Sequence, residues 1–298
     1  MTKRVIVATF MLLILDAHNI FSQANDAPAL VKAVLDKQKT RPFWFRLRSI
    51  SFGYVPYVLD VKTSVEKYDG DGKVKGDGLP HGALGVFTPV EDVLLYTPLE
   101  MGEKPVTEET ANEWEQRREK QLAEAKRRSE AEKKKIKARA EKEMKERAAF
   151  WDEFAKAFRF QILERKEHNG RATVVIGYTP LNGYKPGKAI DTGYLPRIEG
   201  QVWIDEADTE ITRFQMEFTE NVNVGFGLAG KVSKGTSYSM DLRKLIDGLW
   251  LPVKAETTLK MRQLLVTKTN ERYTAEYSNY RKFSTDSKII SSEPVADR

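Results

Sequence analysis

Residues 200–218 read GQVWIDEADTEITRFQMEF, and this stretch decides the fold. The first six residues are typical of a strand, and the polar turn Glu206-Ala207-Asp208 leads into a second strand over 211–218. Alternation in the second strand is expected to place four side chains on one face: Thr212, Phe214, Met216 and Phe218. Because strands joined by so short a turn pair antiparallel, the stretch predicts a β-hairpin.

More strands are expected on both sides of this hairpin. They are predicted over 158–162, 172–178, 237–243, 250–266 and 272–283, with turns at His168-Asn169-Gly170 and Asp247-Gly248. In the last strand, Tyr280 is expected on the face opposite Tyr273 and Tyr277. Short polar turns between successive strands favour a continuous antiparallel meander over βαβ units.

The region 25–106 is also predicted to be mainly β-structure, after a short helix near 27–37. Residues 57–66 alternate apolar with polar side chains, as in a half-buried strand. Asp69-Gly70-Asp71-Gly72 is a turn sequence, because glycine supplies the positive φ that tight turns need. A further strand is predicted over 90–96.

Residues 107–157 differ in composition from the rest of the chain. They contain no Gly or Pro and are rich in Glu, Lys, Arg and Ala, which are good helix formers. Pairs such as Glu113/Arg117 and Glu143/Arg147 recur at helical spacing. We therefore predict one long charged helix of ~60–70 Å, largely solvated and docked mainly at its ends.

Two other interpretations of this helix were weighed. A coiled coil needs sustained apolar a and d positions, and charged residues such as Arg118, Arg128 and Glu132 interrupt that series. Residues 107–154 hold 14 Lys and Arg against 13 Asp and Glu, a net charge of +1. Because acids match the bases almost one for one, the sequence predicts no nucleic-acid partner.

The first 24 residues are predicted to be a signal peptide. Lys3 and Arg4 precede an apolar run over 5–15, and Ser22-Gln23-Ala24 suits a signal peptidase. About 11 apolar residues span roughly 16 Å as a helix, against the ~30 Å of a bilayer core. We therefore expect a periplasmic or otherwise exported protein, soluble after cleavage and without a transmembrane anchor; a buried N-terminal helix of a cytosolic protein is the alternative.

Five segments follow from these patterns: a signal peptide (1–24), N-terminal strands (25–106), a helical insertion (107–157), C-terminal strands (158–283) and a polar tail (284–298). The chain has 298 residues, a net charge of +6 and no cysteine. Without cysteine it holds no disulfide, thiolate zinc site or Cys nucleophile.

Few motifs suggest chemistry. Residues 225–230 read GFGLAG, which matches a dinucleotide fingerprint, but strand-like rather than helical sequence follows, so we predict no cofactor. His81 and His168 lie beside glycines and are expected to be solvated. The acids Asp205, Glu206 and Asp208 are expected in a solvated turn rather than a cation site, because the spacing of a calcium loop is missing. No catalytic, cofactor-binding or metal-ligating residue is predicted.

Several strand and turn motifs resemble those of one known family. They are GQVWID (200–205), EITRF (210–214), GLWLP (248–252) and YSNYRKF (277–283). The sequence resembles the LolA-like superfamily of periplasmic lipoprotein-sorting carriers, and above all a signal-bearing branch in which GEKP, here 102–105, and a long charged helix interrupt the sheet. The resemblance implies an α+β fold, mainly antiparallel: a strongly curved, half-open β-barrel with helices at its concave side. It implies an apolar site for acyl chains and no catalytic residue.

The expected function is that of a non-enzymatic envelope protein that binds an apolar or lipidic ligand in its curved sheet. Its partner would be a lipid, an acyl chain or a lipoprotein. The alternative is a protein-interaction or sensor module whose long helix meets an envelope partner. An exported hydrolase is a third interpretation, but no nucleophile and base are recognisable in the sequence.

Overall fold

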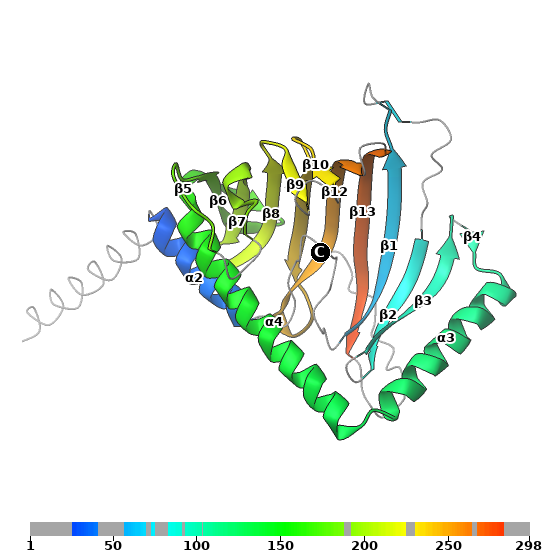
Figure 1. Cartoon of the computed structure of the whole chain (residues 1–298). Coiled ribbons are helices and arrows are strands. Elements are labelled where there is room, and N and C mark those ends of the chain that lie inside the picture. Colours follow the sequence, from blue (N-terminus) through cyan, green and yellow to red (C-terminus); the bar gives the residue numbers. More distant parts are fainter. Residues whose placement is uncertain are drawn as a thin grey trace, which may run out of the picture.

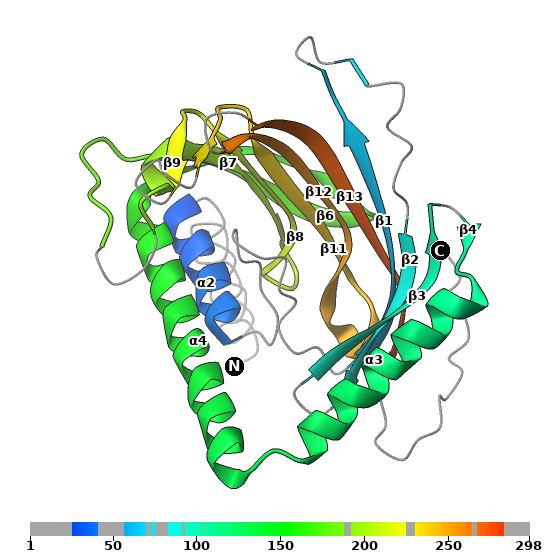
Figure 2. The ribbon, with the colours of Figure 1, turned by 45° about the vertical axis from the view of Figure 1, so that its right-hand side comes forward.

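The computed structural model describes residues 26–40, 57–69, 73–74, 83–90, 93–102, 104–187, 192–224, 230–263 and 267–282. The predicted signal peptide, the polar tail and His81 lie outside these residues, so their interpretation stays a prediction. The described residues form one strongly curved sheet, with helices on its inner side (Figures 1 and 2).

Within the described residues the sheet has thirteen strands, and they pair antiparallel throughout. The first four are β1 (Tyr57–Lys67), β2 (Ala83–Val90), β3 (Val93–Met101) and β4 (Lys104–Pro105). The next four are β5 (Phe158–His168), β6 (Arg171–Pro180), β7 (Ile198–Asp205) and β8 (Glu210–Phe218). The last five are β9 (Val222–Val224), β10 (Gly230–Val232), β11 (Ser237–Lys244), β12 (Trp250–Gln263) and β13 (Thr267–Lys282).

The main path of the sheet runs β4-β3-β2-β1-β13-β12-β11-β8-β7-β6-β5, with the small β9–β10 hairpin attached to β12. β4 and β5 are therefore the two edges. Over the described ranges, the sheet is antiparallel and does not close on itself, and helices lie on its inner side. This arrangement is a half-open β-barrel and confirms the predicted fold class. The meander β5 to β8 and the strands β11 to β13 lie where the sequence predicts strands.

The described part of the chain also has three helices and two short 3-10 turns: α2 (Ala27–Thr40), α3 (Glu108–Lys126), α4 (Glu130–Ala157), η1 (Leu195–Arg197) and η3 (Ile246–Gly248). The predicted single helix over 107–157 is wrong, because two helices replace it. Ser129 caps the second one: its side chain accepts from the backbone N–H of Glu132, whose carboxylate accepts from the backbone N–H of Ser129. This reciprocal capping box starts a new helix at Glu130.

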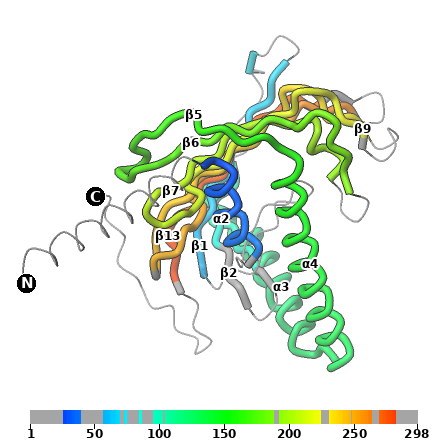
Figure 3. Tube along the Cα trace, turned by 90° about the vertical axis from the view of Figure 1, so that its left-hand side faces the viewer, coloured from blue at the N-terminus to red at the C-terminus, as the bar shows by residue number. Residues whose placement is uncertain are grey.

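The two helices form a V-shaped strap between the edges of the sheet. α3 follows β4 at one edge, and α4 leads into β5 at the other (Figure 2). The strap is docked near its outer ends, as predicted: Trp114 of α3 contacts Tyr96 of β3, and Phe154 of α4 is 4% exposed in the core. The elbow between the helices points away from the sheet (Figure 3).

Two smaller predictions are also wrong. A single strand over 90–96 is replaced by the ends of two paired strands, since β2 ends at Val90 and β3 begins at Val93. Tyr280 lies on the same buried side as Tyr277, because a β-bulge places one extra residue of β13 opposite Leu59. Asn279, at the bulge, has a positive φ of 51°.

Candidate functional site

The concave face of the sheet carries uncharged side chains across most of its width. One row of residues paired in register crosses eight strands: Phe160, Tyr178, Gly200, Met216, Tyr238, Thr257, Tyr273 and Val65. The adjacent row crosses ten: Ile162, Ile176, Val202, Phe214, Met240, Ala255, Ala275, Thr63, Ala83 and Met101. Neither row contains an ionisable acid or base other than tyrosine.

Helices cover this face at both ends of the sheet. At the β5–β8 end, α2 buries Val31 and Val34, and α4 inserts Phe154 against Phe158 and Tyr178, at ring-centroid distances of 4.6 and 5.2 Å. An ion pair of 2.6 Å between Lys39 of α2 and Asp152 of α4 joins the two helices. At the other end, α3 packs on β3. The concave face is therefore a filled core where the helices lie.

Between these ends, the inner side chains of β1, β12 and β13 are only half-buried. They are defined here as the concave midsection: Thr63, Val65, Ala255, Thr257, Tyr273 and Ala275. Tyr178, in the same row as Thr257 and Tyr273, lies on β6, four strands away from β12, and is only 1% exposed. Ala255 and Ala275 are direct cross-strand partners, and Ala275 also pairs with Thr63, so the smallest side chains of the row lie together.

Tyrosine hydroxyls are the main polar groups of this face, and they are held neutral. Burial raises the pKa of Tyr178, Tyr238 and Tyr277 above its ordinary value. Burial, together with a hydrogen bond to Glu271, raises the pKa of Tyr273 to about 12. The midsection therefore presents methyl groups, aromatic rings and neutral hydroxyls.

The opposite face is polar and contains a groove of about 920 Å³ across β7, β8, β11, β12 and β13. Its charged residues are largely paired with one another. Arg213 contacts Asp241 at 3.1 Å, and Arg272 contacts Glu256 at 2.7 Å. Alternation along each strand thus separates a largely uncharged concave face from a charged outer face.

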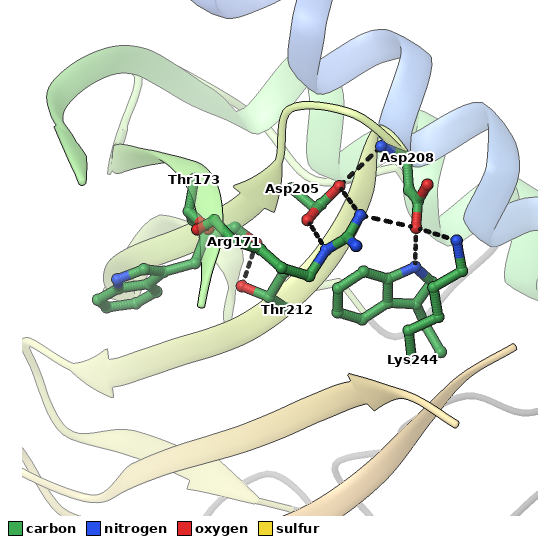
Figure 4. A network of polar contacts seen from close by, with 8 residues as sticks. Arg171, Thr173, Asp205, Asp208, Thr212 and Lys244 are labelled. Carbon is green, nitrogen blue, oxygen red and sulfur yellow. Dashed lines mark hydrogen bonds and ion pairs between the residues drawn. The ribbon is translucent and has the colours of Figure 1, made fainter. Parts of the chain in front are cut away.

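The predicted solvated turn at Asp205 is wrong, because its acids belong to an ion-pair cluster. The Asp205 side chain is 1% exposed and accepts hydrogen bonds from the Arg171 guanidinium, one of them at 2.9 Å (Figure 4). Asp208 contacts Arg171 at 3.2 Å and Lys244 at 2.9 Å, and accepts from the indole of Trp250 at 3.0 Å. The cluster therefore ties the β7–β8 turn to β6, β11 and β12.

Electrostatics keep both carboxyl groups of the cluster ionised. Burial alone would raise the pKa of Asp205, but the hydrogen bonds from Arg171 and from the backbone N–H of Asp208, together with the charge of Arg171, outweigh it, and the pKa lies below its usual value. The hydrogen bond from Lys244 likewise lowers the pKa of Asp208. These partners cannot be recognised from local sequence, because Arg171 and Lys244 are more than thirty residues away from the acids that they contact. Glu206 differs from both: it is exposed and pairs with Arg165.

The structure also describes His168 and the end of the glycine motif. Most of the 225–230 glycine motif lies outside the described residues, but Gly230 begins strand β10 rather than a helix. His168 is half-buried instead of solvated, and burial lowers the pKa of its imidazole. Among the described residues, no three His, Asp or Glu side chains are grouped to hold a metal ion. Within the same ranges, no helix has the length and hydropathy needed to span a bilayer.

Comparisons with known proteins give matches only among solved structures. No family model and no curated protein match the chain. A DUF1329 family protein from Desulfovibrio piger ATCC 29098 is 8% identical over 86% of this chain and 91% of its own, with a TM-score of 0.29. A LolA superfamily protein from Nitrosomonas europaea is 11% identical over 88% and 97%, with a TM-score of 0.26.

A putative outer membrane lipoprotein-sorting protein domain from Vibrio parahaemolyticus is also similar, at 10% identity over 87% of this chain and 95% of its own, with a TM-score of 0.28. Scores this low support no inference about ligand or site residues, which must come from the geometry above. The solved structures that this chain is similar to thus include one described as a LolA superfamily protein, the superfamily that its sequence motifs resemble.

Proposed function

We propose that this protein is a non-enzymatic envelope protein that holds an apolar or lipidic ligand against the concave midsection. One observation carries the proposal: two uncharged rows cross the sheet, helices cover them at both ends, and the part between is half-buried. Export to the periplasm rests on the sequence of residues 1–24.

Burial of hydrocarbon supplies enough free energy for such a ligand without polar chemistry. Each methylene that leaves water contributes ~0.8 kcal/mol, so contact with a dozen methylenes gives roughly 10 kcal/mol before the entropic cost of binding. Ala255, Ala275 and Thr63 have small side chains, while Met240 on one side of them is long and adaptable. The residues present therefore suit an acyl chain lying across the strands.

The chemistry of the midsection also favours binding over catalysis. A general base or nucleophile needs a group that ionises near neutral pH, and the tyrosine pKa values are raised away from that range. Thr63 and Thr257 are neutral hydroxyls in rows without a histidine or carboxylate.

A pair of substitutions on neighbouring residues tests the proposal. Ala275→Trp fills the midsection, whereas Thr274→Trp adds the same side chain on the outer face, next to Glu256 in register. We expect lipid extracted from the purified protein, measured by mass spectrometry, to be lost in A275W and retained in T274W. Binding of a fluorescent fatty acid should change in the same way. Equal lipid content in both variants, or none in the wild-type protein, would contradict the proposal.

An interaction module remains the second candidate, because most residues of 127–145, at and after the elbow of the strap, are exposed to solvent. The two functions respond to different substitutions. A carrier loses its ligand when Ala275 is enlarged, whereas an interaction arm loses its partner when the elbow is changed. Removing the whole strap would be a poor test, since it connects the two edges of the sheet.

A further inference from the structure

The positive charge of the protein is concentrated in the elbow of the strap. Residues 126–139 read KRRSEAEKKKIKAR and contain eight Lys or Arg and two Glu, a net of +6. The whole chain also has a net charge of +6, so the other 284 residues sum to zero. Averaging over 107–154 hides this segment, and the expectation that acids match bases along the helix is wrong at the elbow.

The two glutamates of the elbow leave six of its eight positive charges uncompensated. Glu132 is turned toward the backbone and accepts hydrogen bonds from the N–H and hydroxyl of Ser129, at 2.7 and 2.8 Å. Glu130 pairs with Lys133 at 2.9 Å. Five exposed basic residues take part in no ion pair with a described residue: Lys126, Arg127, Lys134, Lys135 and Lys137.

These basic side chains point in all directions around the helix and do not form a single flat or concave surface. Successive residues of a helix project about 100° apart, so Lys133, Lys134 and Lys135 point in three directions. The elbow is also the part of the strap that lies farthest from the sheet (Figures 2 and 3). A convex set of charges suits a partner whose anions can rearrange around it.

We propose that the elbow, residues 126–139, docks this protein on the anionic surface of a lipid membrane. Clusters of four to eight basic residues bind such surfaces, and each Lys or Arg strengthens the attraction. Fluid anionic headgroups can gather around a convex tip, whereas a protein or a nucleic acid would need a surface of matching shape. Apolar side chains are sparse here, with only Ile136 larger than alanine, so attachment is electrostatic and reversible.

Docking in this way is independent of the ligand in the concave midsection but complements it. The strap passes from one edge of the sheet to the other on the concave side, so a docked elbow turns that side toward the membrane (Figure 2). A protein that takes up or delivers an acyl chain would gain from that orientation. If the midsection binds nothing, the elbow can still dock.

Vesicle co-sedimentation of the purified full chain tests this inference. We expect binding to phosphatidylcholine vesicles that contain phosphatidylglycerol, weak binding to pure phosphatidylcholine, and a steep loss of binding as salt is added. Lys134→Glu, Lys135→Glu and Lys137→Glu together should weaken binding roughly 100-fold. The matched control is Lys73→Glu, Lys185→Glu and Lys231→Glu, three exposed residues of the sheet and its loops, which should lose much less.

Several outcomes would overturn the proposal. They are equal binding to neutral and anionic vesicles, equal losses in the two triple variants, or tighter binding of an acidic protein or RNA than of the anionic vesicles. Circular dichroism and thermal unfolding check that both variants are folded, which we expect for solvated positions. Fatty-acid binding by the elbow variant separates the two proposals: it should be unchanged, whereas A275W should lose the fatty acid and keep the vesicles.

Discussion

Tyr178 lies across Gly200, its partner on the next strand, and its hydroxyl donates a 2.7 Å hydrogen bond to the main-chain carbonyl of Gln215 on the strand beyond. The ring therefore links β6, β7 and β8, and it also stacks on Phe214 with centroids 5.9 Å apart. A side chain at position 200 would occupy the space of this ring. The glycine of the GQVWID motif is thus explained by packing.

Gly200→Ala should be strongly destabilising. Its Cβ would lie 2.0 Å from the Gln215 carbonyl oxygen and 2.5 Å from the Tyr178 hydroxyl, so strand β8 or the ring must move. We expect a loss of about 2–3 kcal/mol in urea unfolding. Tyr178→Phe, which removes only the hydrogen bond, should cost about 0.5–1.5 kcal/mol. Gly193→Ala is the control, since no atom lies near its Cβ, and a comparable loss there would contradict this explanation.

Asp205→Asn tests the ion-pair cluster. The substitution leaves the Arg171 guanidinium without its buried partner, and breaking a fully buried pair costs ~3–5 kcal/mol. Because Arg171 is 36% exposed and can be hydrated, we expect a smaller loss of about 2–3 kcal/mol. Glu206→Gln, which breaks the exposed pair with Arg165, should cost less than about 1 kcal/mol. Equal costs at the two positions would show that burial of Asp205 is unimportant.

The same cluster predicts how stability depends on pH. The pKa of Asp205 and that of Asp208 are lowered in the folded state, so the unfolded chain binds protons first as pH falls. Their contribution is complete above the ordinary Asp pKa of about 4 and is lost as pH falls through the lowered values. The difference in unfolding free energy between wild type and D205N should therefore shrink below about pH 4. A constant difference down to pH 2 would contradict the assigned direction.

Ser129→Ala should loosen the start of α4 without unfolding the protein. The hydroxyl of Ser129 is one half of the capping box that begins the helix. Its loss should speed hydrogen exchange of the amides of the first turn roughly five-fold. The thermal midpoint should barely change, because the elbow is exposed. Glu132→Gln preserves the capping pattern and should leave exchange near the wild-type rate. An unchanged rate in S129A would show that the box does not hold the elbow.

Local patterns of the sequence were sufficient to predict most of the sheet. Alternation over 57–66 and 211–218 marks strands whose one face is buried, and the structure has them there. The same rule failed over 90–96, because only Glu91 and Asp92 separate the end of β2 from the start of β3, and this pair lacks the Gly or Asn typical of a two-residue turn. The capping signal Ser129-x-x-Glu132 was present but is easily passed over inside a run of helix formers.

The candidate site is harder to predict, because it depends on pairing between distant strands. Ala255, Ala275 and Thr63 form one row only in the register that the folded sheet adopts, and nothing local to any of them indicates the other two. One end of the face is filled by α2 and α4 and the other is covered by α3, and these helices are also far from the site in sequence. The net charge of the elbow is visible in the sequence when the 14 residues 126–139 are counted alone, but not when the 48 residues 107–154 are counted together.

The bulge at Asn279 reverses the order of stability that is expected for valine and glycine in a regular strand. In a regular strand, valine is preferred to both asparagine and glycine, so Asn279→Val would stabilise the protein. At the observed φ of 51°, a β-branched residue is strained by about 1–3 kcal/mol, whereas glycine is not. Both substitutions remove the 2.7 Å hydrogen bond from Asn279 to Asp60, so that loss cancels between them.

We therefore expect N279G to be more stable than N279V in urea unfolding. The bulge is also what keeps Tyr280 buried, with its hydroxyl donating to the Pro252 carbonyl at 2.6 Å. If N279V relieves its strain by making the strand regular, Tyr280 turns to the outer face and becomes accessible to iodination, while Tyr277 stays protected. The reverse order of stability, with valine above glycine, would mean that β13 has no bulge at this position.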